Sequence, residues 1–413
     1  MPRLPKSLLG SLKAVLRPTF IRAMVARARL EKTLFPSAKP DAARGSSGSG
    51  SLVIFGMFES ASGLGVAARG MAHALADLHP KCVSLSELSH TPRLQASSLR
   101  SITPLAPEAG RAALALHVVN PDIFLGAVWR FGTRWITGNR RNIALAIWET
   151  ETLPAGWADV LSLYDLICTH SRFAARAFEK ATGRPVGIIP HSLPERLIRV
   201  RRSGGPIEFL TMFDHASCLD RKNPLGVVRA FREAMAALPA GSARLRIKCH
   251  AGTPTDAIDR LLAEAGGAPV EILARTFDEA GMEALWQECD CLLSLHRSEG
   301  FGLPVAEALS RAIPVVSSRQ GGVLDFADDS GCLLVSGIPA TSPPSRGQYL
   351  EWSGWLEPDL TMATNHIVEV VADYPAALER AAVGQSRIRH SLSPEQIRRQ
   401  FDSALAACRE KRG

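Results

Sequence analysis

Several features that mark common protein classes are missing from this sequence of 413 residues. No apolar run approaches the ~20 residues that a membrane-spanning helix needs, so we expect no segment to cross a bilayer. The eight cysteines are scattered and lie mostly in apolar stretches, which indicates a reducing compartment without a disulfide framework. Cys289 and Cys291 lack a His or Cys pair at zinc-like spacing and are expected in the core. No internal repeat of short period is present.

Acidic residues are scarce in the first 35 residues, which contain eight lysines and arginines but only one acidic residue, Glu31. This segment therefore carries a charge of +7, out of a net charge of +8 for the whole sequence. The rest of the chain is nearly neutral, which argues against a nucleic-acid-binding surface. Two apolar sets follow helical spacing on either side of Pro18: Leu8, Leu9, Leu12, Val15 and Leu16, then Phe20, Ile21, Met24 and Val25. Residues 1–36 therefore predict a basic amphipathic arm that binds an anionic membrane surface. A mitochondrial presequence and a disordered tail are the alternatives.

A small, polar, glycine-rich stretch from 37 to 51 predicts a flexible linker between this arm and the folded body. Short apolar strands then alternate with helices in two series, 52–200 and 206–390. Strands are predicted at 52–56, 113–119, 143–148, 163–169, 186–190, 207–213, 243–249, 270–273, 289–295, 313–317 and 332–335. This order predicts an α/β fold of two halves with a ligand in the cleft between them. We expect the last helix, within 391–413, to pack back on the first half.

Two carboxylates eight positions apart, Glu299 and Glu307, bracket a glycine-rich turn between a predicted strand and a predicted helix at 305–311. Such a turn directs backbone N–H groups and the positive end of a helix dipole at whatever lies above it, which suits a phosphate or a sugar hydroxyl. One carboxylate can then face a sugar and the other a ribose. A Glu in the first turns of a helix is also a common capping residue, so the spacing alone leaves both interpretations open.

The residues from His296 to Leu309, followed by Ile313-Pro-Val-Val316, resemble the Glu-x7-Glu motif of bacterial family 4 glycosyltransferases. The resemblance runs from Leu52 to about residue 410. Segments 148–157, 171–173 and 189–191 resemble a subgroup that acts in polysaccharide assembly. The resemblance implies a GT-B fold, in which two Rossmann-like domains face each other across a cleft and bind a nucleotide-sugar.

The activity implied by this resemblance is a retaining transfer of a hexose, with mannose favoured, from a nucleotide diphosphate sugar. The acceptor would be a saccharide or a polyprenyl-linked saccharide in exopolysaccharide or lipopolysaccharide synthesis, at the inner face of the bacterial cytoplasmic membrane. We find no Asp-x-Asp donor-metal motif, and neither a metal nor another cofactor is expected. A non-catalytic GT-B protein that binds nucleotide-sugars and a GT-B epimerase are the alternatives.

The family motif also implies roles for individual donor-side residues. Glu307 would accept the ribose hydroxyls, and Glu299 would lie near the transferred sugar. The turn residues Gly300, Phe301, Gly302 and Leu303 would approach sugar and phosphate through their backbone. Gly63 and Gly65 resemble a glycine-rich loop across the cleft from the phosphates.

Basic residues for the leaving diphosphate are implied at Arg221 and Lys222, which precede a predicted helix at 224–238. Many relatives carry a further arginine just after the first strand of this half, where this chain has Met212 and Phe213. One phosphate contact is therefore missing or supplied from elsewhere.

Acceptor-side candidates follow the strand at 143–148. Glu149 and Glu151 stand at its carboxyl end, so either one could orient or deprotonate the acceptor hydroxyl. His170, His191 and His296 also lie near strand ends, where a lone histidine is more often structural.

Overall fold

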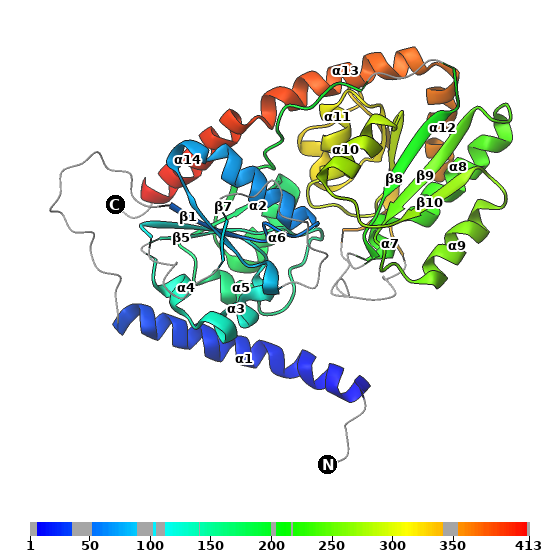
Figure 1. Ribbon diagram of the computed structural model, residues 1–413. Helices are drawn as coiled ribbons and strands as arrows, with labels where there is room; N and C mark the ends of the chain where they lie inside the picture. The colour runs from blue at the N-terminus through cyan, green and yellow to red at the C-terminus, as the bar shows by residue number, and fades with distance from the viewer. Residues whose placement is uncertain are drawn as a thin grey trace.

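A computed structural model describes residues 6–34, 52–88, 102–104, 112–139, 141–199, 204–215, 218–341 and 354–410. These residues form two parallel α/β domains side by side (Figure 1). The predicted α/β architecture of two halves is thus confirmed. The linker predicted at 37–51 lies outside the described residues.

The N-terminal domain holds a seven-stranded parallel sheet in the order β3-β2-β1-β4-β5-β6-β7. Its strands are β1 (Leu52–Gly56), β2 (Lys81–Ser84), β3 (Ile102–Pro104), β4 (Leu114–Val118), β5 (Asn142–Leu145), β6 (Leu166–Thr169) and β7 (Val186–Ile188). Its helices are α2 (Gly63–Ala74), α3 (Phe124–Phe131), α4 (Arg134–Thr137), α5 (Trp157–Leu161) and α6 (Arg172–Thr182). Strand β1 is buried along its whole length because helices or loops cover both faces of the parallel sheet.

The C-terminal domain holds a six-stranded parallel sheet in the order β10-β9-β8-β11-β12-β13. Its strands are β8 (Ile207–Met212), β9 (Ala243–Cys249), β10 (Val270–Ala274), β11 (Cys291–Ser294), β12 (Val315–Ser318) and β13 (Leu333–Val335). Its helices are α7 (Leu219–Lys222), α8 (Pro224–Ala237), α9 (Thr255–Ala265), α10 (Glu279–Gln287), α11 (Leu303–Ser310), α12 (Leu360–Ala372) and α13 (Tyr374–Ser391). A separate antiparallel pair, β14 (Gly337–Pro339) and β15 (Leu356–Pro358), follows β13.

Every predicted strand is present, with bounds that differ by a few residues. The sequence did not reveal β2 and β3, which form one edge of the first sheet, because β2 contains only two buried apolar residues and β3 only three residues. Cys289 and Cys291 are buried, as expected of core cysteines.

The arm forms a single helix, α1 (Lys6–Leu34), that continues through Pro18. Its side chains Ile21, Val25 and Ala28 are buried in the core of the N-terminal domain, and Arg22 pairs with Asp159 at 3.3 Å. Figure 1 shows α1 beneath α3, α4 and α5. Part of the second apolar set predicted for membrane contact therefore packs on the protein itself. Among the helices that the structure describes, none combines the length and the apolar character that a membrane-spanning helix requires.

The last helix, α14 (Pro394–Glu410), leaves the C-terminal domain and lies against α2 and β7 of the N-terminal domain (Figure 1). Ile397 and Phe401 are buried there beside residues of α2. The chain thus passes between the domains twice, once after β7 and once after α13. The two passages touch, because the Leu193 N–H donates to the Leu392 carbonyl at 2.9 Å.

Candidate active site

The turn between β11 and α11 is shaped by close backbone packing. Gly302 precedes α11 with φ of 92°, a conformation that favours glycine, and a side chain there would overlap Val323. A second glycine pair, Gly321 and Gly322, lies directly against the turn, and the Gly322 N–H donates to the Glu299 carbonyl at 2.9 Å. Sequence reasoning missed this pair, although two glycines after a predicted strand were a visible signal.

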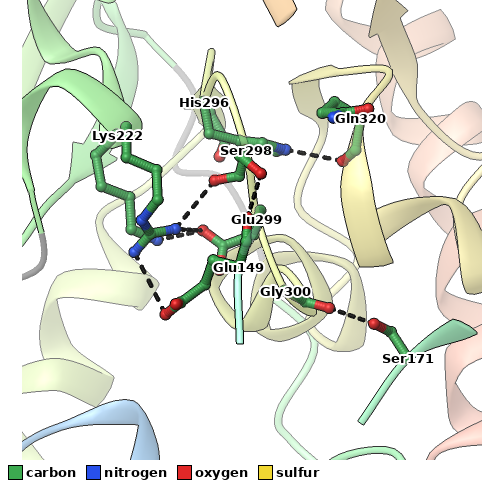
Figure 2. A network of polar contacts seen from close by, with 10 residues as sticks. Glu149, Ser171, Lys222, His296, Ser298, Glu299, Gly300 and Gln320 are labelled. Carbon is green, nitrogen blue, oxygen red and sulfur yellow. Dashed lines mark hydrogen bonds and ion pairs between the residues drawn. The ribbon is translucent and has the colours of Figure 1, made fainter. Parts of the chain in front are cut away.

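The Glu299 carboxylate lies between two cations. It pairs with the Arg221 guanidinium at 3.3 Å and with the Lys222 ammonium, and its side chain is 12% exposed (Figure 2). Burial alone would raise the pKa of Glu299, but the charges of Lys222 and Arg221 outweigh it and lower the pKa to about 2. Glu299 is therefore ionised throughout the physiological range.

Arg221 is enclosed, whereas its neighbour Lys222 is less so. The Arg221 side chain is only 2% exposed, and its guanidinium donates to the Ser298 carbonyl at 3.0 Å. It also lies 3.7 Å from the Glu149 carboxylate of the N-terminal domain. The two basic residues are the last two of α7 and precede α8, as expected. The Asn223 side chain between the helices accepts from the Gly226 N–H at 3.2 Å and caps α8. Arg221 thus stabilises the turn through its hydrogen bond to Ser298, whereas the Lys222 side chain is more accessible to a ligand.

Glu307 is the fifth residue of α11, and its surroundings differ from those of Glu299. Burial raises the pKa of Glu307, and the positive charges of Arg311 and Arg196 only partly offset this. Among the residues that the structure describes, no cation contacts this carboxylate directly. Its oxygens can therefore accept hydrogen bonds from a ligand.

The N-terminal domain closes on the turn through backbone contacts. Ser298 Oγ donates to the Glu149 carbonyl, and Ser171 Oγ donates to the Gly300 carbonyl (Figure 2). A side chain at Gly300 would overlap the Trp148 carbonyl. The Arg172 N–H donates to Asp325 at 2.7 Å, a contact that the sequence did not suggest. The turn is thus a point of direct contact between the domains.

Of the two acceptor-side carboxylates, Glu149 joins the Arg221–Glu299 cluster, while Glu151 is exposed and lies beside Gly354. Gly63, at the start of α2, has open space around it. Gly65 packs tightly against the Ser60 carbonyl, so its lack of a side chain serves the loop itself.

The three histidines near the site have structural contacts. His170 and His191 stack with ring centroids 3.9 Å apart, and the Phe301 ring lies 4.7 Å from His191. The His296 ring lies 3.1 Å from both Ser294 Oγ and the Gln320 carbonyl. Burial lowers the pKa of His170 and of His296 to about 4, so both rings are neutral near pH 7. In the described parts of the chain, no group of three or more His, Cys, Asp or Glu side chains could hold a metal ion.

Solved structures share this arrangement of two domains. Anabaena Alr3699/HepE in complex with UDP and glucose matches with a TM-score of 0.62 and 14% identity, over 87% of this chain and 100% of that chain. Sucrose-phosphate synthase from Thermosynechococcus elongatus matches with a TM-score of 0.59 and 16% identity, over 87% of this chain and 98% of that chain. The apo form of the lipopolysaccharide outer core galactosyltransferase WaaB matches with a TM-score of 0.58 and 12% identity, over 86% of this chain and 99% of that chain. At these identities the likeness defines the fold, which is GT-B.

Residues 199–401 match a family model described as "Family 4 Glycosyltransferase in conflict systems". This range contains the C-terminal domain with both carboxylates of the motif. The C-terminal domain is thus similar to family 4 glycosyltransferases. A comparison with curated proteins finds no match.

Proposed function

We propose that the protein is a retaining hexosyltransferase that uses a nucleotide diphosphate sugar. The observation that carries this proposal is the pairing of Glu299 with Lys222 and Arg221 at a glycine-rich turn, with the open carboxylate of Glu307 on the helix that follows. A diphosphate donor needs cations and backbone N–H groups on one side and a ribose acceptor group nearby, and this turn offers all three. HepE, solved with UDP and glucose, supports a nucleotide-sugar as the class of donor.

In the proposed reaction, the bond between the anomeric carbon and the diphosphate oxygen breaks while the acceptor oxygen bonds to the same face of that carbon. Lys222, the turn N–H groups and the dipole of α11 stabilise the charge that develops on the diphosphate. Arg221 acts on this charge through its hold on the turn. The proton of the acceptor hydroxyl passes to the departing phosphate, and Glu149 is the carboxylate best placed to orient that hydroxyl. Glu151 is the second candidate for this role.

The donor and acceptor are tested together by a panel of UDP- and GDP-sugars, with nucleotide release measured in the presence and absence of bacterial membrane lipid extract. GDP-mannose is the donor that the family resemblance favours, and UDP-glucose follows because HepE was solved with it. Sugar transfer that depends on the extract supports a lipid-linked acceptor in polysaccharide synthesis. Nucleotide binding without turnover supports the non-catalytic binding protein instead, and release of an isomerised sugar supports the epimerase.

We also propose that α1 places the N-terminal domain on an anionic membrane, at the cytoplasmic face. Ile21, Val25 and Ala28 pack inward, whereas three other apolar side chains of the helix are exposed: Phe20 at 57%, Leu30 at 58% and Leu34 at 61%. The side chains of Arg22 and Arg27 are 74% and 64% exposed on the same helix. Apolar and basic side chains together suit anionic lipid.

Vesicle sedimentation tests this face without removing α1, whose loss would uncover the core of the N-terminal domain. The full chain should sediment with phosphatidylserine-containing vesicles, and the variant Leu30→Glu with Leu34→Glu should lose most of this binding. Leu197→Glu is a matched control because Leu197 is 75% exposed and lies far from α1 in the sequence. Equal sedimentation of all three proteins would refute the proposed membrane face.

A further inference from the structure

A half-buried lysine without a partner lies at the carboxyl end of β9. Lys248 is the next-to-last residue of this strand, and its register partner on β8 is Met212. Strand alternation places Ile247 and Cys249 in the core on one face and Lys248 on the other, which is the face that α11 packs against. Within the described residues, the Lys248 ammonium has no hydrogen-bond or ion-pair partner.

The charges around Lys248 are mainly acidic. Asp214, just after β8, and Glu307, on α11, both act on the ammonium electrostatically, and Cys249 and His250 are its neighbours in the chain. His250 lies 3.9 Å from the Asp214 carboxylate. Burial lowers the pKa of Lys248, and the two carboxylates oppose this decrease. Lys248 therefore lies close to Glu307, but among the described residues no carboxylate contacts its ammonium group.

The position of this cation suggests a ligand rather than a structural role. Withdrawing an ammonium from water is costly unless a counter-charge contacts it, and the part of the chain that the structure describes provides none within contact distance. Ligands of parallel α/β sheets bind outside the carboxyl ends of the strands, which is where Lys248 lies. Its register neighbour Met212 belongs to the segment that lacks the arginine carried by many relatives.

We propose that Lys248 completes the donor site by binding a phosphate oxygen of the nucleoside diphosphate beside the ribose held by Glu307. The inference rests on the proposed donor class, and it assigns the missing phosphate contact to β9 instead of the end of β8. Lys248 and Lys222 then approach the diphosphate from two adjacent parts of the sheet, with Lys248 nearer the nucleoside.

The test compares a ligand that carries the diphosphate with one that lacks it. Calorimetry measures UDP binding and ligand-observed NMR measures uridine binding to the full chain and to Lys248→Met; GDP and guanosine are used if the protein prefers GDP. Loss of a hydrogen bond between charged groups should weaken diphosphate binding by roughly 10- to 100-fold. Uridine binding should change by less than about twofold because the nucleoside carries no charge for Lys248 to bind. Lys248→Arg should restore part of the affinity.

The matched control is Lys180→Met, which removes an exposed lysine from the end of α6 and should change neither affinity. Unchanged UDP binding in Lys248→Met would overturn the inference. An equal loss for UDP and uridine would also overturn it, because Lys248 would then act through Glu307 on the ribose. If the unaltered protein binds neither UDP nor GDP, the proposed donor class itself fails, and that result is seen before any variant is made.

Discussion

The two ends of the turn between β11 and α11 carry the same side chain in opposite electrostatic surroundings. Glu299 contacts two cations and has a pKa near 2, whereas Glu307 has a raised pKa and, within the described residues, no contacting cation. The first carboxylate is satisfied by the protein, and the second is open to a ligand. In the proposed site, a diphosphate would compete with Glu299 for Lys222, while a ribose would meet Glu307, which no cation contacts within the described residues.

The strongest test of this contrast is Glu299→Gln, which removes one charge and keeps the shape. We expect kcat to fall by roughly 10²- to 10³-fold because Lys222 and the buried Arg221 lose the charge that positions them against the developing negative charge. The donor KM should change little. Steady-state kinetics with the best donor of the panel measures both. Glu264→Gln is the matched control because Glu264 also pairs with two arginines, Arg229 and Arg232, but on α9.

The second test alters the contact between the domains without changing any charge. In Gly300→Ala, the added methyl group overlaps the Trp148 carbonyl and pushes the turn away from the N-terminal domain. We expect kcat/KM to fall by roughly 10- to 100-fold, since a shift of about 1 Å in a positioned group has effects of this size. Gly252→Ala is the control because open space surrounds Gly252. Equal activity of the two variants would show that the turn tolerates displacement.

A smaller effect is expected for Glu307→Gln. The neutral amide keeps one oxygen for the ribose, so nucleotide binding should weaken by roughly 10-fold, as expected for one hydrogen bond to a charged group. The value of kcat at saturating donor should stay within about threefold. Calorimetric titration with UDP or GDP, paired with kinetics, separates the two quantities. A large fall in kcat with unchanged binding would reverse the roles assigned to the two carboxylates.

The pH dependence of stability should distinguish the two carboxylates by sign. The pKa of Glu299 is lowered from 4.5 to about 2, so its stabilising contribution is complete above about pH 4.5 and is lost as the pH falls toward 2. This contribution is at most about 3 kcal/mol. The pKa of Glu307 is raised, so its ionisation costs stability as the pH rises through the carboxyl range.

Urea unfolding of the parent and both glutamine variants, from about pH 7 down to about pH 2.5, measures these differences. The difference in the free energy of unfolding between the parent and Glu299→Gln should shrink as the pH falls. The free energy of unfolding of Glu307→Gln should increase relative to that of the parent as the pH rises. Parallel curves for all three proteins would contradict the electrostatic contrast between the two carboxylates.

Much of the fold followed from the sequence because apolar strands and helical spacing are local signals. The ranges of β1 and β9 agree with those expected from the residues alone. The motif likewise located the Glu299 turn. Contacts that join distant segments left no comparable signal: Gly322 against the turn, Asp325 against Arg172, and Trp355, which is buried in the core of the N-terminal domain.

The spacing of apolar residues also did not show whether an apolar helix face would pack against the protein or against a membrane. The spacing of Ile21 and Val25 predicted an amphipathic helix, and the helix is present, but these side chains pack on the domain beneath it. Glu149 and Glu151 looked equivalent in the sequence, since both follow the same strand. Only the approach of the C-terminal domain separates them, because Arg221 reaches Glu149 from the other half of the molecule.

The two neighbouring passages of the chain between the domains limit how the active site can open. The passages are joined by the Leu193–Leu392 hydrogen bond, so a hinge motion between the domains would have its axis in this one small region. Rotation about that axis would separate Ser171 from Gly300 and Glu149 from Arg221 together, so the proposed site and the domain contacts would open as one. Donor entry and the loss of the Glu149–Arg221 ion pair would then be a single event.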